Sequence, residues 1–168
     1  EEYSNVSEDE ARNYFEKNKN DYKQIRASHI LISNYDSNNK EVSDKKKAEN
    51  KKTAEEVLKL ALDGEDFATL AKEYSDDSSA SKGGDLGYFT QDEMVSAFSK
   101  AAFSLKTGEI YNKVVETSSG YHIIKKTGEK DQDFDDVKDD LIKTLESTKQ
   151  NTLMQDLYTK YDVQIKNQ

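Results

Sequence analysis

Hydrophobic and polar residues alternate in two short segments that lie far apart in the chain. The first runs from Ile25 to Ile32 and the second from Tyr121 to Lys126, and they contain the 2 histidines of the sequence, His29 and His122. Successive side chains of a strand point to opposite faces of a sheet, so each imidazole can face an enclosed site while its neighbours pack on the other side. The pattern predicts two strands that bring buried imidazoles into one polar site.

Other segments repeat apolar residues every three or four positions, the spacing of a helix with one buried face. Ser7 to Glu10 has the form of a capping box, so a helix is expected to begin there and to run toward Tyr22. Ser43 is expected to cap a longer helix that ends near Leu62 and is followed by a shorter one. The predicted inward positions of these three helices are Ala11, Tyr14, Phe15, Asn18 and Tyr22, then Ala48, Val57, Leu58, Ala61 and Leu62, then Phe67, Leu70, Ala71 and Tyr74.

The second half of the chain predicts another helix over residues 91–105, which presents Met94, Phe98 and Phe103. Residues 111–116 and 121–126 are expected to pair as a hairpin, and residues 87–89 form a further strand. The tail is predicted to be an amphipathic helix, with a break midway left open, and residues 162–165 alternate like a short strand. Four short strands and about four helices indicate an α+β fold. The apolar positions of the tail are Val137, Leu141, Leu145, Leu153, Leu157 and Tyr161.

Composition narrows the classes of partner and chemistry. The 168 residues suit one principal domain with appended helices, and a charged fraction of 35% against 33% hydrophobic residues indicates a small core with solvated helices. The net charge is −9 and the one lysine-rich run, residues 45–52, is interleaved with glutamate, so no nucleic-acid partner is expected. The absence of cysteine excludes disulfides, thiolate catalysis and cysteine-based zinc sites.

No apolar run in the sequence approaches the length of a membrane span, and no signal peptide or lipidation cysteine is recognisable. Any anchor of the parent protein is therefore expected to lie outside this chain. A metal hydrolase is disfavoured because His29 and His122 lack the helical two-histidine spacing of such sites, and no cofactor is implied.

Four ordered motifs together resemble the parvulin family of peptidyl-prolyl cis/trans isomerases, over roughly Ile25 to Gly128. The motifs are Ser28-His29-Ile30-Leu31, Gly83-Gly84-Asp85-Leu86-Gly87-Tyr88-Phe89, Met94 with Phe98, and Ser119-Gly120-Tyr121-His122-Ile123-Ile124. The resemblance implies the parvulin fold, a four-stranded antiparallel sheet surrounded by about four helices. It also implies prolyl isomerase activity for residues 25–128.

The flanking segments look like the helical arms of extracytoplasmic bacterial foldases of the PrsA and SurA kind, in which a parvulin domain interrupts a chaperone domain. The expected plan is an N-terminal arm at residues 1–24, the isomerase domain at 25–128 and a C-terminal arm at 129–168. Because half a chaperone domain needs more residues than precede Ile25, we expect this chain to be a fragment. The resemblance implies a location at the outer face of the bacterial membrane or in the cell-wall space.

The resemblance also assigns roles to particular residues. It implies a proline pocket at Leu86, Met94 and Phe98, and a catalytic hydrogen-bond network that comprises His29, Asp77, Ser119 and His122. Residue types alone leave alternatives open. A methionine and aromatic stripe is often ordinary core, a strand histidine is often structural, and Asp77 and Ser119 could be turn residues.

Prolyl isomerisation makes and breaks no bond, so we expect non-covalent catalysis on unfolded or partly folded secreted polypeptides that contain Xaa-Pro bonds. Residues 33–38 carry no cation, so specificity for phosphorylated substrates is not expected. The alternative is a parvulin-fold module that holds extended peptides with little or no turnover. If the exposed apolar stripes of the arms pair in a two-fold way, the chain forms a homodimer; a monomeric mass by light scattering at high concentration would count against this.

Overall fold

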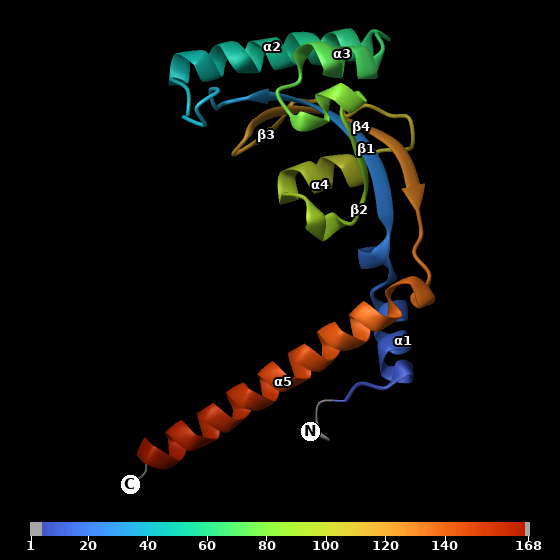
Figure 1. Ribbon diagram of the computed structural model, residues 1–168, viewed down its shortest axis with the longest axis vertical. Helices are drawn as coiled ribbons and strands as arrows, with labels where there is room; N and C mark the ends of the chain where they lie inside the picture. The colour runs from blue at the N-terminus through green and yellow to red at the C-terminus, as the bar shows by residue number, and fades with distance from the viewer. Residues whose placement is uncertain (1–4, 167–168) are drawn as a thin grey trace. The chain divides into compact units, whose positions relative to one another are not determined.

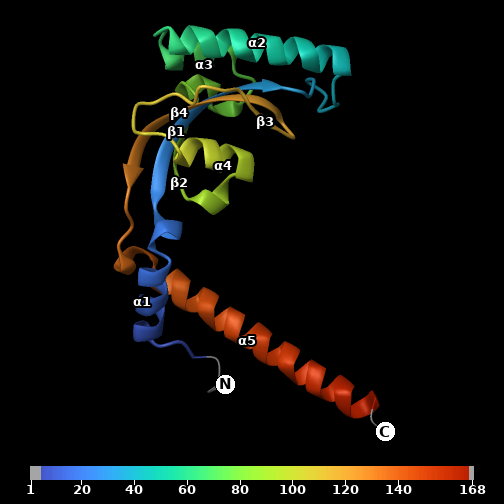
Figure 2. The same ribbon diagram turned by 180° about the vertical axis from the view of Figure 1, so that it is seen from behind.

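The two histidine-bearing strands lie side by side in the middle of a four-stranded antiparallel sheet, whose strand order is β2-β1-β4-β3. The computed structural model describes residues 5–166, with side chains to residue 162, and Figures 1 and 2 show it from two sides. The central strands are β1 (Gln24–Ser33) and β4 (Gly120–Lys130), and the edge strands are β2 (Asp85–Phe89) and β3 (Val115–Thr117). The predicted α+β fold with its antiparallel sheet is confirmed.

Alternation along the central strands divides the core between the two faces of the sheet. One face packs against α2 (Asp44–Leu62) and α3 (Phe67–Tyr74), and the other packs against α4 (Ser96–Phe103); Figure 1 shows α2 and α3 on the side of the sheet opposite to α4. The strand residues of the first face are Ile30, Ile32, Tyr121 and Ile123, and those of the second are Ile25, Ala27, Phe89, Val115 and Ile124. His29 and His122 lie on the second face of the sheet, on the side of α4.

The helices α2 and α3 begin at side-chain caps. Ser43 accepts a hydrogen bond from the backbone amide of Lys46, as the sequence predicts, and Asp66 caps α3 in the same way. The predicted inward face of α2 is partly wrong, because Ala48 and Leu62 are exposed. The residues that turn inward are Asn50, Ala54, Val57, Leu58 and Ala61, which follow one stripe of the helix more closely than the predicted set.

The loop after α3 follows β1 beyond the end of β2 and is tied to it by polar bonds. Ser75 Oγ accepts from the backbone amide of Leu31, whose carbonyl accepts from the amide of Asp76. The Asp76 carboxylate accepts from the amide of Ser33 at 2.8 Å. These bonds satisfy backbone groups of β1 that no strand pairs with, and they carry the next residue, Asp77, toward the sheet.

Residues 91–105 do not form the single predicted helix. A short 3-10 helix, η3 (Gln91–Glu93), and α4 are separated by Met94 and Val95, and the backbone of Met94 is extended at φ −119° and ψ 160°. The carboxylate of Glu93 accepts a hydrogen bond from the backbone amide of Thr90, and Ser99 Oγ donates to the carbonyl of Gln91. These contacts stabilise the break between the two helices. Met94 therefore does not follow the helical backbone of α4.

The described residues on either side of Lys23–Asp131 form a second compact unit. It contains α1 (Glu8–Lys17), the 3-10 turn η1 (Lys19–Tyr22) and α5 (Phe134–Lys166). The capping box of α1 is confirmed, because Ser7 accepts from the amide of Glu10 and Glu10 accepts from the amide of Ser7. Its small core consists of Val6, Ala11, Phe15, Phe134 and Leu141.

Three expectations about this second unit are corrected. The first helix ends at Lys17 rather than near Tyr22, and Tyr14 is exposed. The tail is one continuous helix of 33 residues, so the short strand predicted at residues 162–165 is wrong. A strand needs a neighbour to satisfy its backbone, whereas a helix satisfies its own.

No helix within residues 5–166 is long and apolar enough to cross a membrane.

Candidate active site

The two imidazoles meet because their strands pair in one register. His29 lies opposite Ile124 and His122 opposite Leu31, so the histidines are diagonal neighbours on the same face of the sheet. Their Nδ1 atoms lie 3.1 Å apart, and their rings are nearly stacked with an interplanar angle of 21°. Both side chains are buried, with 6% and 7% of their surface exposed. A hydrogen bond between the two nitrogens requires one to carry the proton and the other to accept it.

Asp77 extends this pair at one end. Its Oδ2 lies 3.1 Å from Nε2 of His29, which is an ion-pair distance, although the geometry does not align a hydrogen bond to that nitrogen. The same carboxylate accepts from the hydroxyl and the backbone amide of Ser79, and so caps the 3-10 helix η2 (Ser78–Lys82). A carboxylate is therefore held firmly beside the imidazoles.

Thr117 extends the pair at the other end. Its Oγ1 lies 2.7 Å from Nε2 of His122, and it also accepts from the backbone amide of Ser119. The sequence led us to expect the hydroxyl of Ser119 at this place in the network. The structure puts Thr117 there, and Ser119 lines the pocket nearby. Both hydroxyls belong to the run Thr117-Ser118-Ser119 before Gly120, and the sequence carries no signal that selects one of them.

An apolar wall stands beside the polar line. Phe98 is buried in α4 and presents its edge to both imidazoles, with ring centroids 5.6 Å from His29 and 5.5 Å from His122. Leu86 from β2 and Met94 from the break before α4 pack near it. The pocket that these residues and the polar line enclose has a volume of about 310 Å³. Its lining also includes Leu31, Glu93 and Val95, which sequence reasoning did not single out.

The environment holds the network in defined charge states. Burial alone would raise the pKa of Asp77. The hydrogen bonds from Ser79, together with the interaction with the neighbouring His29 ring, outweigh burial and lower that pKa to about 2. Burial, together with the neighbouring His29, lowers the pKa of His122 to about 4, although Asp77 opposes the shift. At neutral pH the pocket therefore holds an ionised Asp77 and a neutral His122.

The low pKa of His122 predicts a specific pH dependence of stability. In the unfolded chain an imidazole binds its proton near pH 6.5, whereas native His122 binds it only near pH 4. The free energy of unfolding is expected to be greatest above pH 6.5 and to fall by on the order of 3 kcal/mol as the pH is lowered toward 4. Urea denaturation at a series of pH values tests this. His122→Asn should show a flatter profile in this window, and an unchanged slope would contradict the assignment.

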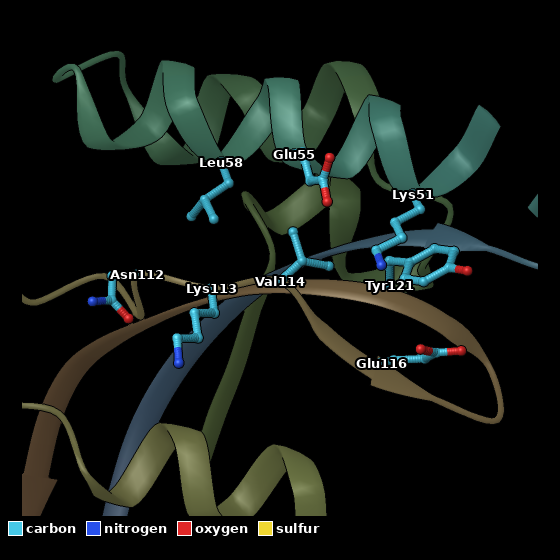
Figure 3. Close-up of a pocket in the computed structure, with 8 residues that line it drawn as sticks. All are labelled: Lys51, Glu55, Leu58, Asn112, Lys113, Val114, Glu116 and Tyr121. Carbon is cyan, nitrogen blue, oxygen red and sulfur yellow. The ribbon is translucent and has the colours of Figure 1, made fainter. Parts of the chain in front are cut away.

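A second hollow lies on the opposite face of the sheet. Figure 3 shows Lys51, Glu55 and Leu58 of α2 facing the segment that leads into β3, and the hollow has a volume of about 370 Å³. Its four charged side chains are two lysines and two glutamates, and it shares no lining residue with the imidazole pocket. Because its charges balance and it lacks the buried imidazoles, we take the pocket on the other face as the candidate site.

Comparison with known proteins agrees with this arrangement. A family model of the PPIC-type PPIase domain matches residues 13–130. The chain belongs to this family. The foldase protein PrsA of Bacillus subtilis is 46% identical over 150 residues, which are 85% of this chain and 45% of that protein. The foldase protein PrsA of Caldanaerobacter subterraneus is 40% identical over 154 residues, with coverage of 91% and 45%.

Solved structures show the same fold. The crystal structure of PrsA from Bacillus subtilis matches with a TM-score of 0.52 and 45% identity, over 89% of this chain and 51% of that one. The peptidylprolyl isomerase PrsA from Bacillus anthracis matches with a TM-score of 0.57 and 34% identity, over 93% and 65%. The expected parvulin fold and the likeness to these foldases are confirmed. The chain spans about half the length of the curated relatives it matches.

Proposed function

We propose that this chain catalyses cis/trans isomerisation of peptidyl-prolyl bonds in unfolded or partly folded secreted polypeptides. The observation that carries the proposal is an apolar wall placed directly against a line of hydrogen-bonding groups. The wall is Leu86, Met94 and Phe98, and the line runs from Asp77 through the two imidazoles to Thr117. Membership of the PPIC-type PPIase family supports the same reaction.

The reaction requires both the apolar wall and the line of hydrogen-bonding groups. Rotation about the amide has a barrier of about 18–20 kcal/mol because the bond must lose its conjugation as it twists. An apolar pocket receives the pyrrolidine ring and favours the less conjugated, less polar amide, while fixed dipoles and charges match the altered charge distribution. No covalent step is needed, so the carboxylate of Asp77 acts through its field and through the histidines it faces.

Each network residue has a proposed role. Asp77 supplies a permanent negative charge, and His29 transmits its influence to His122 through the contact of the two Nδ1 atoms. Thr117 holds the ring of His122 in place, and Ser119 supports Thr117 with its amide and contributes a hydroxyl to the pocket lining. Neither carboxylate attack nor a bound metal enters this scheme. Within residues 5–166 no three histidine, aspartate or glutamate side chains cluster in a way that could hold a metal ion.

The wider setting of the domain is also a proposal. We assign residues 25–128 to the isomerase domain and residues 1–24 and 129–168 to arms of a foldase domain that acts outside the cytoplasm. The foldase relatives support this assignment, as does the separation of the described flanking residues into their own compact unit. The match of the family model to residues 13–130 includes part of both arms.

A holding function is the second candidate, because one part of the chain displays apolar side chains to solvent. The second half of α5 exposes a row of large apolar residues, each with at least 44% of its surface accessible: Leu153, Met154, Leu157, Tyr158 and Tyr161. Such a row can bind extended apolar segments, or a second copy of the chain, without isomerase turnover. It lies in the unit that does not contain the imidazoles.

NMR exchange between the cis and trans forms of an unphosphorylated Ala-Pro peptide separates the two candidates. Wild-type protein is expected to accelerate exchange, and Met94→Ala is expected to lower kcat/KM about tenfold because it removes apolar contact worth about 1.4 kcal/mol. The chain has 2 methionines, so Met154→Ala on the exposed face of α5 is a matched control that should keep full activity. Peptide binding with unaltered exchange would show a holding module instead.

A further inference from the structure

The pocket has a strongly one-sided charge. Two of its lining residues are carboxylates, Asp77 and Glu93, and none is a lysine or an arginine. His122 is neutral at neutral pH, so the two carboxylates leave the pocket negative. The carboxylates belong to different elements, since Asp77 precedes η2 and Glu93 ends η3.

Glu93 is held at the rim in a defined place. Its Oε2 accepts from both the backbone amide and the hydroxyl of Thr90, which fixes the side chain in a capping box. Both bonds use the same carboxylate oxygen. The side chain is exposed, and it directly precedes Met94 of the apolar wall. A charge with this fixed position can discriminate between ligands, whereas a freely moving surface carboxylate discriminates weakly.

The residue before the proline takes part in the isomerised bond, so it must enter the pocket together with the proline, and there it can come within reach of Glu93. When a proline ring packs against Met94, the residue before the proline follows at the mouth of the pocket, because consecutive Cα atoms are about 3.8 Å apart. Glu93 is one residue from Met94 and is separated from it by the same spacing. A long basic side chain at the preceding position can therefore reach the carboxylate, whereas an acidic or phosphorylated side chain meets two negative charges.

We propose that Glu93 is a specificity-determining residue that makes this isomerase prefer Lys-Pro and Arg-Pro bonds over Glu-Pro bonds. The proposal rests on the isomerase function argued above and names the class of substrate for that site. The attraction is partly solvated, so the preference is moderate and is carried by encounter and binding more than by the twisting step. It also adds a physical reason for the expected lack of phosphate specificity, because the rim repels anions.

The test compares three peptides that differ only at the residue before proline, which is lysine, glutamine or glutamate. In wild-type protein, kcat/KM from NMR exchange is expected to be about fivefold to tenfold higher for Lys-Pro than for Glu-Pro, in line with the modest strength of exposed charge pairs. Glu93→Gln keeps an oxygen for the Thr90 cap and should bring the ratio to within about twofold of unity, mainly through KM. High salt should shrink the wild-type ratio in the same direction.

Asp63→Asn is the matched control, because it removes the same charge from an exposed site at the end of α2 and should leave the ratio unchanged. A wild-type ratio near unity, or a ratio that survives Glu93→Gln, would overturn the proposal while the isomerase function stands. Failure of all three peptides to be accelerated would instead remove the isomerase function itself, and the proposal with it. Thermal melting of Glu93→Gln establishes that the variant is folded.

Discussion

Gly84→Ala is expected to lower the free energy of unfolding by at least about 4 kcal/mol and to leave much of the chain unfolded. The backbone of Gly84 has φ +81°, and a Cβ there would lie 2.2 Å from the carbonyl oxygen of His29. That oxygen belongs to a central strand, and Gly84 in turn accepts a hydrogen bond from the amide of His29 at 2.9 Å. The added methyl group must therefore displace the loop from the strand that carries the site.

Gly87→Ala is the control for this change. Gly87 has φ +70° three residues further on, within β2, but a Cβ there meets no atom within 4 Å. This variant should lose only the cost of a left-handed backbone, about 1 kcal/mol. Urea denaturation of the two variants separates steric overlap from backbone strain. Similar midpoints for both would show that the loop can move away from β1, and the close approach would then be unimportant.

Asp77→Asn is expected to reduce kcat/KM for an Ala-Pro peptide by about a hundredfold, the lower end of the effect of removing one preorganised electrostatic group. The amide can still accept from Ser79 and keep the 3-10 turn, so the change removes the charge that faces His29 and little else. The pKa of Asp77 is lowered to about 2 because its neighbours favour the ionised form. The field of this carboxylate is therefore present throughout the physiological pH range.

The lowered pKa also sets the stability cost of this variant. A carboxyl whose pKa falls from its ordinary value of 3.8 to about 2 stabilises the fold above pH 4, and this contribution is lost as the pH falls through 2. Asp77→Asn should therefore destabilise by about 1–2 kcal/mol at neutral pH, which leaves the protein folded for the exchange measurement.

Asp76→Asn provides the matched change one residue away. It removes the same charge but retains an oxygen for the amide of Ser33, and Asp76 does not line the pocket. Its kcat/KM should stay within about twofold of the wild-type value, since its carboxylate is exposed to solvent outside the pocket, where water weakens its field. Activity of Asp77→Asn equal to that of this control would remove Asp77 from the catalytic network and leave it a structural cap.

Features with a local or periodic cause were predictable from the sequence. Strand alternation predicted that His29 and His122 face one polar site from two strands, and the structure brings them within contact on neighbouring strands. The capping residues Ser7 and Ser43 marked helix starts correctly, because an N-cap depends only on the following turn. The ordered motifs indicated the parvulin fold, and the family match agrees.

Other features depend on residues that are distant in the sequence. Thr117 rather than Ser119 contacts His122, because the hairpin turn between β3 and β4 sets which hydroxyl reaches the ring. Met94 leaves the helical pattern because the Thr90 cap and the Ser99 hydroxyl stabilise a break before α4. A role for Glu93 in substrate preference can be inferred only from its position at the rim of the pocket.

The sequence by itself determined most of the strand and helix segments and the main residue types of the site, although not the break at Met94 or the short extent of β3. Periodicity, caps and motifs are properties of neighbouring residues, and they express the backbone geometry of one element at a time. Tertiary structure alone decided which side chains touch, how burial shifts the pKa of His122 and Asp77, and that α5 continues through residues 162–165. Contact, desolvation and strand pairing all depend on partners that packing brings together from distant parts of the chain.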